Sequence, residues 1–149
     1  MPLEPDERRR ITEARVARLA TTRPDGRPHV VPITFALRGE TIVTAVDQKP
    51  KTTTSLQRLK NIAAQPAASV LVDHYDDDWS RLWWVRADGS ARVATQGTEW
   101  QEWVELLAQK YVQYGNDVPR GPLIVLSVGR WTSWTGRQRD VGRPAEDDP

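Results

Sequence analysis

The segment KPKTTTSLQRLKN, residues 49–61, combines the residue types that bind a phosphate group. Lys49 and Lys51 precede a hydroxyl-rich helix start, whose first N–H groups have no partner inside the helix. Arg58 and Asn61 are one turn apart and lie on the same side of that helix. Unpaired N–H groups, hydroxyls and cations at one helix end are typical of an anion site. A solvated surface helix that its own threonines cap is the alternative for this segment.

The segment DHYDDD, residues 73–78, offers carboxylates and an imidazole, which are ligands for hard metal ions. Their spacing matches no EF-hand or zinc pattern, so we predict no metal site. We expect a solvated loop between two strands, paired with arginines such as Arg81 and Arg86. The chain has no cysteine, which excludes disulfides and cysteine nucleophiles. His29 and His74 are its only histidines, and no serine motif beside them indicates a hydrolytic triad.

Tryptophan dominates the aromatic residues, with seven Trp against three Tyr and one Phe. Trp83 and Trp84 are consecutive in a predicted strand, so their side chains point to opposite faces of the sheet. Both cannot be core residues of an isolated two-layer domain. A second chain or a planar ligand would cover the other one, because Trp is frequent at both kinds of site. Dense packing inside a small barrel is the alternative.

These residues need a scaffold, and the hydrophobic pattern predicts six short strands with helices between them. Residues 16–46 predict three strands joined by tight turns, and Val31, Ile33, Phe35 and Leu37 share one face of the middle strand. Because strands and helices do not alternate throughout, the order predicts a mainly β protein with helices (α+β), built as a six-stranded antiparallel barrel. We expect one domain over residues 1–135 and a flexible tail over 136–149.

The charges balance, with 21 Lys and Arg against 20 Asp and Glu, for a formal net charge of +1. No bulk field therefore draws the chain to nucleic acid or to an anionic membrane. Charged residues interrupt the N-terminal segment where a secretory signal needs an apolar run, and no window is long and apolar enough to span a bilayer. We expect a cytoplasmic protein with neither nucleic acid nor membrane as a partner.

Four segments together resemble a known family. They are ARLATTRPDGRPHVVPITFAL, TIVTAVDQKPK, RLKNIAAQPAASVLVDHY and DWSRLWWVRADGSARV. They resemble the split β-barrel flavin/deazaflavin oxidoreductases, which are similar to pyridoxamine-5′-phosphate oxidase, and within these the branch of probable F420-dependent enzymes. The resemblance covers residues 8–135 and implies the FMN-binding split-barrel fold. It also implies a homodimer with two cofactor sites at the interface, where Trp79, Trp83 and Trp84 of one chain wall the pocket of the other.

The resemblance further implies which residues bind the cofactor, F420 or alternatively FMN. Two strand segments would run beside the ring and beside its polar edge or ribityl chain: Val31, Pro32, Ile33 and Thr44, Ala45, Val46. The phosphate and any acidic tail would be held by Lys51, Arg58 and Asn61. The partner chain would contribute Trp84, Arg86, Trp134 and Arg137. The substrate motif of true pyridoxamine-phosphate oxidases is not visible after Trp134, so we do not expect that activity.

The first functional hypothesis is an F420-dependent reductase that transfers a hydride from the reduced deazaflavin to a small electron-poor substrate. No catalytic side chain is identified, and a proton would come from His74, Tyr75 or solvent. The second hypothesis is an FMN-binding oxidase or flavin reductase of the same fold. The third is a non-enzymatic barrel that sequesters a cofactor or stacks nucleic-acid bases on Trp. The net charge of +1 and the acids at 76–78 argue against nucleic acid.

Overall fold

The computed structural model describes residues 2–46 and 53–137, with the backbone alone for residues 53–56. Lys49, Lys51 and most of the predicted tail lie outside the described residues. The elements, in chain order, are α1 (Pro5–Glu13), β1 (Ala17–Thr22), β2 (Pro28–Ile33), β3 (Ala36–Arg38), β4 (Thr41–Ala45), α2 (Thr53–Ala64), β5 (Ala67–His74), the 3-10 helix η1 (Trp79–Arg81), β6 (Trp83–Ala94), α3 (Thr98–Lys110), α4 (Val112–Asn116) and β7 (Leu123–Thr135).

The strands form one antiparallel sheet in the order β2-β1-β5-β6-β7-β4-β3. The predicted class, mainly β with helices, is confirmed, but the predicted count of six strands was wrong because the sheet has seven. The predicted middle strand of the first three is broken at Thr34 and Phe35, and its halves are β2 and β3. The backbone N–H of Phe35 donates to the Tyr111 hydroxyl, 3.1 Å away, instead of to a neighbouring strand.

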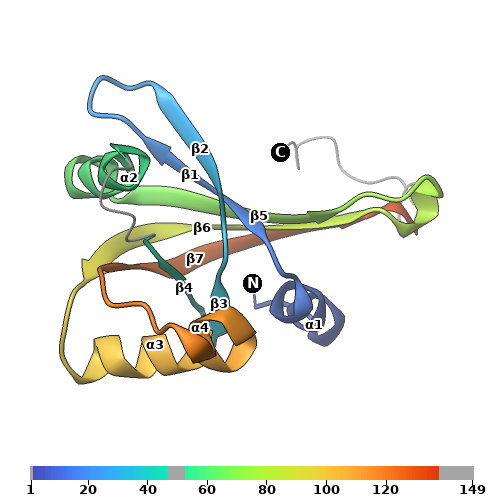
Figure 1. The fold of residues 1–149 in the computed structure, drawn as a ribbon. Helices are drawn as coiled ribbons and strands as arrows, with labels where there is room; N and C mark the ends of the chain where they lie inside the picture. Colours follow the sequence, from blue (N-terminus) through green and yellow to red (C-terminus); the bar gives the residue numbers. More distant parts are fainter. Residues whose placement is uncertain (1, 47–52, 138–149) are drawn as a thin grey trace.

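This break closes the sheet on itself. β2 and β3 are the two edge strands, yet only Thr34 and Phe35 separate them in the chain. Two residues span less than about 10 Å, so the two edges of the sheet must lie close together. The sheet is therefore curled into a half-barrel, and β2 runs directly into β3 (Figure 1). The curl also changes the burial pattern, because the consecutive residues Phe35 and Ala36 are both buried.

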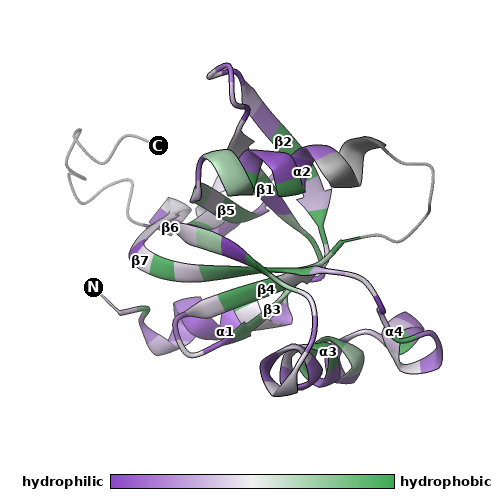
Figure 2. Cartoon of the chain, turned by 90° about the vertical axis from the view of Figure 1, so that its left-hand side faces the viewer, coloured by the Kyte–Doolittle hydropathy of each residue, from purple (hydrophilic) through white to green (hydrophobic). Residues whose placement is uncertain are grey.

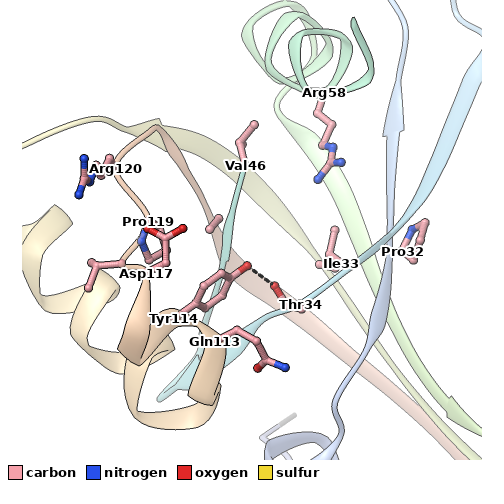
Figure 3. Close-up of a pocket in the computed structure, with 12 residues that line it drawn as sticks. Pro32, Ile33, Thr34, Val46, Arg58, Gln113, Tyr114, Asp117, Pro119 and Arg120 are labelled. Carbon is pink, nitrogen blue, oxygen red and sulfur yellow. Dashed lines mark hydrogen bonds between the residues drawn. The ribbon is translucent and has the colours of Figure 1, made fainter. Parts of the chain in front are cut away.

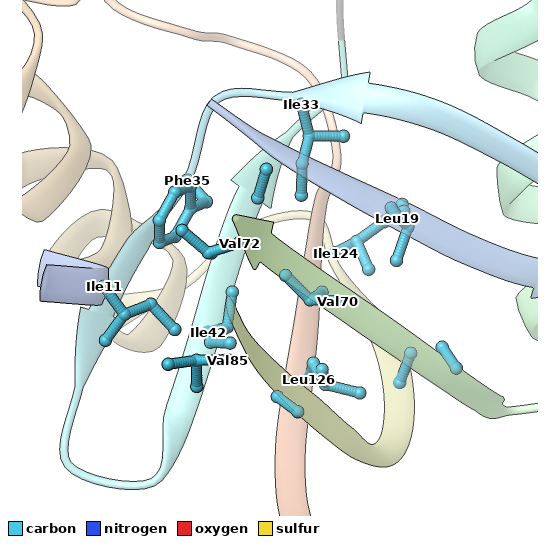
Figure 4. Packing of buried hydrophobic residues seen from close by; sticks show 14 of the residues in the cluster. Ile11, Leu19, Ile33, Phe35, Ile42, Val70, Val72, Val85, Ile124 and Leu126 are labelled. Atoms are coloured by element: carbon cyan, nitrogen blue, oxygen red, sulfur yellow. The ribbon is translucent and has the colours of Figure 1, made fainter. Parts of the chain in front are cut away.

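The concave face of the curled sheet holds the main core. Leu19 of β1, Val70 of β5, Val85 of β6 and Leu126 of β7 pack together there (Figure 4). Helix α1 adds Ile11, which is fully buried. Burial of such side chains is the main source of stability, at about 1.5–3 kcal/mol for each one.

A second cluster lies between α3 and the sheet. The spacing of apolar residues in the segment 98–115 predicts one apolar side, formed by Trp100, Trp103, Val104, Leu107 and Tyr111. The structure confirms it, because all of them are buried except Trp100, which is partly buried against the same cluster. They pack on Val43 of β4 and on neighbouring strand residues. Hydrophilic residues occupy much of the outward surface of α1 and α3 (Figure 2). None of the helices formed by the described residues has the length and apolar character needed to cross a membrane.

The two longest strands, β6 and β7, are paired along nearly their whole length, and their register shifts between Asp88 and Gly89. Asp88 is opposite Arg130 and Gly89 is opposite Val128, so Gly129 is an extra residue on β7. A Cβ atom placed on Gly89 would overlap the backbone carbonyl of Ser127. The sequence predicts that Asp88-Gly89 interrupts a strand over residues 81–94, and the structure instead continues the strand and has a bulge there, which depends on a residue without a side chain.

We predict that Gly89→Ala lowers the free energy of unfolding by about 1–3 kcal/mol, because β7 must move to admit the methyl group. Gly129→Ala is the matched control, since its Cβ would have no neighbour closer than 3.8 Å and its change should stay within about 0.5 kcal/mol. Urea denaturation of the three proteins measures both values. Equal stabilities of the two variants would contradict the close approach at Gly89.

Candidate cofactor-binding groove

A groove of about 950 Å³ opens where the two edges of the curled sheet meet (Figure 3). The ends of β2 and β4 and the adjoining residues form its floor, with Pro32, Ile33, Thr34, Ala45 and Val46. Arg58 extends into the groove from α2, which lies above this floor (Figure 3). The floor is mainly apolar and one of its ends carries a positive charge.

The opposite wall is α4 and the segment that connects it to β7. It contributes Gln113, Tyr114 and residues 117–120. Tyr111 has extended backbone angles, φ −115° and ψ 120°, and separates the short α4 from α3. The segment 98–115 predicts one continuous helix, which was wrong at Tyr111, and the wall formed by α4 was not predicted. The tyrosines at 111 and 114, three residues apart before a Pro- and Gly-containing segment, were the available signal.

Hydrogen bonds hold the floor against this wall. The hydroxyl groups of Tyr114 and Thr34 are 2.8 Å apart. The Thr44 hydroxyl donates to the Thr34 carbonyl at 2.6 Å, which ties β4 to the end of β2. The Tyr111 hydroxyl lies 3.0 Å from the Arg15 carbonyl and 3.1 Å from that of Phe35, and burial raises its pKa. Hydrogen bonds thus hold the strand break from both sides.

The structure brings several of the predicted cofactor-binding residues together in the groove: Pro32, Ile33, Ala45, Val46 and Arg58. Val31 and Thr44 lie on the same strands, each one residue before the part of its strand that lines the groove. Val31 packs partly against the main core, and Thr44 is buried.

Asn61 is a fully buried residue of α2 and does not line the groove. Its side-chain nitrogen donates to the Thr21 hydroxyl of β1 at 2.9 Å. Its side-chain oxygen accepts from Gln57 at 2.7 Å. Both ends of the amide are therefore occupied, and this pair of bonds ties α2 to the sheet.

The four residues predicted for the partner chain lie away from this groove. Trp84 and Trp134 are directly opposite each other on β6 and β7, and the Arg86 guanidinium is 5.8 Å from the Trp84 ring centroid. They occupy the convex face of the sheet, since their neighbour Val85 points into the core. Arg137 is exposed just after β7. Within one chain, these residues and the groove are two separate features.

The acidic segment pairs only partly as expected. Arg81 Nε lies 3.7 Å from Asp78, as predicted, whereas Arg86 Nε pairs with Asp88 of its own strand at 3.2 Å. In residues 2–46 and 53–137, no three His, Asp or Glu side chains gather in a way that could hold a metal ion. His74 and Tyr75, the suggested proton donors, lie at the end of β5 and are not part of the groove lining.

A curled antiparallel sheet with a groove between its edges is the geometry of a split barrel. The family described as Pyridoxamine 5′-phosphate oxidase matches residues 3–135, and the chain belongs to that family. The resemblance found in the sequence is confirmed at this level.

Solved structures of low sequence identity have the same fold. A conserved hypothetical protein from Mycobacterium tuberculosis is 20% identical with a TM-score of 0.73, over 95% of this chain and 89% of that one. A FAD-binding protein from Mesorhizobium loti is 18% identical with a TM-score of 0.65, over 89% and 95%. The heme storage protein HutZ from Vibrio cholerae is 15% identical with a TM-score of 0.68, over 91% and 95%. No curated protein matches the sequence.

We predict that Asn61→Ala lowers the free energy of unfolding by about 1–3 kcal/mol, because the buried Thr21 hydroxyl and the Gln57 amide lose their shared partner. Lys60→Ala, one residue earlier on the exposed side of α2, should change it by less than about 0.5 kcal/mol. Chemical denaturation followed by Trp fluorescence measures both. A variant of Asn61 as stable as the Lys60 variant would contradict the structural role of this amide.

Proposed function

We propose that this protein is an oxidoreductase that binds a phosphate-bearing flavin or deazaflavin in the groove between α2 and α4. The proposal depends on one observation: the groove has a mainly apolar floor, formed by residues 32–34 and 45–46, and the Arg58 guanidinium lies at one end of it. A planar ring fits against the floor, and a phosphate fits at the guanidinium, which binds such groups through paired N–H donors.

The groove suits such a group in size and in chemistry. Its volume, about 950 Å³, lies at the upper end of the range for small-molecule sites. Backbone groups at the end of β2 and the side chains of Gln113 and Tyr114 supply polar partners beside the apolar floor. The bound cofactor supplies the hydride chemistry. The chain itself orients the ring with β2 and β4, compensates the phosphate charge with Arg58, and excludes water with α4.

Within this class we propose F420 as the cofactor and a small electron-poor compound as the hydride acceptor. The support is the resemblance of DHYDDDWSRLWWVR, residues 73–86, to the F420-dependent branch. FMN is the alternative, and the similarity to FAD-binding proteins supports a flavin in general. A heme is supported less by the site, because no histidine is among the residues that line the groove.

We further propose that the chain forms a homodimer through the convex face of the sheet. Trp84, Trp134 and Leu71 lie there only partly covered, and Val30 of the edge strand β2 is 61% exposed. Large apolar side chains of this kind are frequent at interfaces. Pro32 belongs to the same face and also lines the groove. A second chain on this face would therefore lie beside the groove and contribute side chains to it.

We predict that the protein binds F420 or FMN in a saturable manner. Arg58→Gln should raise the dissociation constant about 10- to 100-fold, because a charged hydrogen-bond donor to the phosphate is lost. Lys60→Gln, on the exposed side of the same helix, is the control and should bind as the unchanged protein does. Parallel fluorescence titrations with F420, FMN and hemin measure the affinities. Binding of hemin alone, or of none of the three, would overturn the proposed function.

We predict a dimer in sedimentation velocity, and Val30→Asp should shift the equilibrium to monomer by placing a charge in the apolar contact. Val112→Asp makes the same change on α4, where the side chain is 75% exposed and away from the convex face, and should leave the dimer intact. A wild-type protein that sediments as a monomer at micromolar concentration would contradict the dimer.

A further inference from the structure

Two hydroxyl groups lie together where the floor of the groove meets the α4 wall. Thr34 directly follows β2 and belongs to the floor, whereas Tyr114 comes from α4, and both residues line the groove. Their oxygen atoms are 2.8 Å apart, and Figure 3 shows them facing each other across this junction. Among the described residues, each hydroxyl has only the other as its hydrogen-bond partner.

This pair of hydroxyl groups has one hydrogen atom more than its own bond uses. Each group carries one hydrogen, and the bond between them uses one of the two, whichever oxygen donates it. The second hydrogen needs a different acceptor, and none is present among the described residues. It is therefore available to an acceptor atom on a molecule in the groove.

Packing holds the Tyr114 ring in position. The ring is partly buried against the cluster between α3 and the sheet. The ring of Tyr111 meets it edge to face, with the centroids 5.6 Å apart and the planes at 69°. The Tyr111 hydroxyl is occupied by backbone groups at the strand break, so only the Tyr114 hydroxyl is left at the groove. A donor that is already held in place loses little conformational freedom when it binds a ligand.

The position of the pair suits the edge of a planar ring. The floor of the groove is formed by residues 32–34 and 45–46, and the two hydroxyls stand where this floor ends at α4. A ring that lies on the floor has its hydrogen-bonding atoms in its own plane, so its edge faces this boundary. Flavins and deazaflavins both carry two carbonyl oxygens at the edge of the ring system, and such oxygens accept hydrogen bonds in the plane of the carbonyl group.

We propose that Tyr114 donates its hydroxyl hydrogen to a ring carbonyl of the bound cofactor, while the Thr34 hydroxyl donates to Tyr114. This inference rests on the proposed function, because it takes the same cofactor as its ligand. A phenol is a stronger acid than an aliphatic alcohol, which makes Tyr114 the better donor of the two. The bond from Thr34 polarises the Tyr114 hydroxyl and strengthens its bond to the ligand. Both are positioning residues, which determine the edge of the ring that faces α4.

The carbon-13 NMR spectrum of bound FMN, labelled at both ring carbonyls, tests this inference. A hydrogen bond withdraws electron density from a carbonyl carbon and moves its resonance downfield. Tyr114→Phe should therefore move one of the two resonances upfield and leave the other in place. Thr34→Val should move the same resonance by a smaller amount, because Tyr114 then donates without support. Thr34→Ser keeps a hydroxyl group and should leave both resonances unchanged.

Tyr111→Phe is the matched control, because it removes the hydroxyl of a neighbouring tyrosine that does not line the groove. It should lower the free energy of unfolding, since the backbone N–H of Phe35 loses its acceptor. Both carbonyl resonances should stay unchanged in this variant. Circular dichroism verifies that each variant is folded.

Affinities separate the ring contact from the phosphate contact. Tyr114→Phe should raise the dissociation constants of FMN and of riboflavin by the same factor, about 3- to 10-fold, because both carry the ring. Arg58→Gln should affect FMN and not riboflavin, which has no phosphate.

The possible results separate this inference from the proposed function. FMN that binds with the same carbonyl resonances in the unchanged protein and in Tyr114→Phe overturns this inference alone. Equal shifts in Tyr111→Phe and Tyr114→Phe do the same, because the effect then comes from a displaced wall and not from a lost donor. Absence of binding by both FMN and F420 overturns the proposed function and this inference together.

Discussion

The two-residue link between β2 and β3 is the constraint on which the rest of the structure depends. It joins strands at opposite edges of the sheet, so the sheet has to curl until these edges meet. Thr34 and Phe35 have left the β ladder, and their polar groups are bonded instead to Tyr114, Thr44 and Tyr111. Buried backbone groups without such partners are costly, which explains why polar hydroxyls gather at this one place in an apolar barrel.

The same link forms the groove. Because the edges of the sheet meet without pairing along their length, the ends of β2 and β4 are left beside each other with α2 on one side and α4 on the other. Arg58 belongs to the α2 side, and Tyr114 belongs to the α4 side. The groove is therefore apolar along the sheet and charged on both sides, with Arg58 on the α2 side and with Asp117 and Arg120 on the α4 side.

The tryptophans divide between the two faces of the sheet. Trp83 packs partly against the core on the concave side, with the Arg10 guanidinium 5.8 Å from its ring centroid. Trp84 and Trp134 form a cross-strand pair on the convex side. Trp79 is 54% exposed in η1, where the long strands β5 and β6 are connected. Trp83 on the concave face thus contributes to the core. Trp84 and Trp134 on the convex face belong to the surface that we propose as the dimer interface.

The sequence alone determined the family, the mainly β class, the apolar stripe of α3 and an irregularity of β6 near Gly89, because these depend on local periodicity and on glycine. It also selected Arg58 and the ends of β2 and β4, which the structure places together in the groove. Only the tertiary structure decided the seventh strand, since the hydrogen bonds that compensate the break at Thr34 and Phe35 come from Tyr111 and Tyr114, more than 70 residues later. It likewise decided the role of Asn61, because a side chain's partners across a sheet depend on register and curl, which local patterns do not encode.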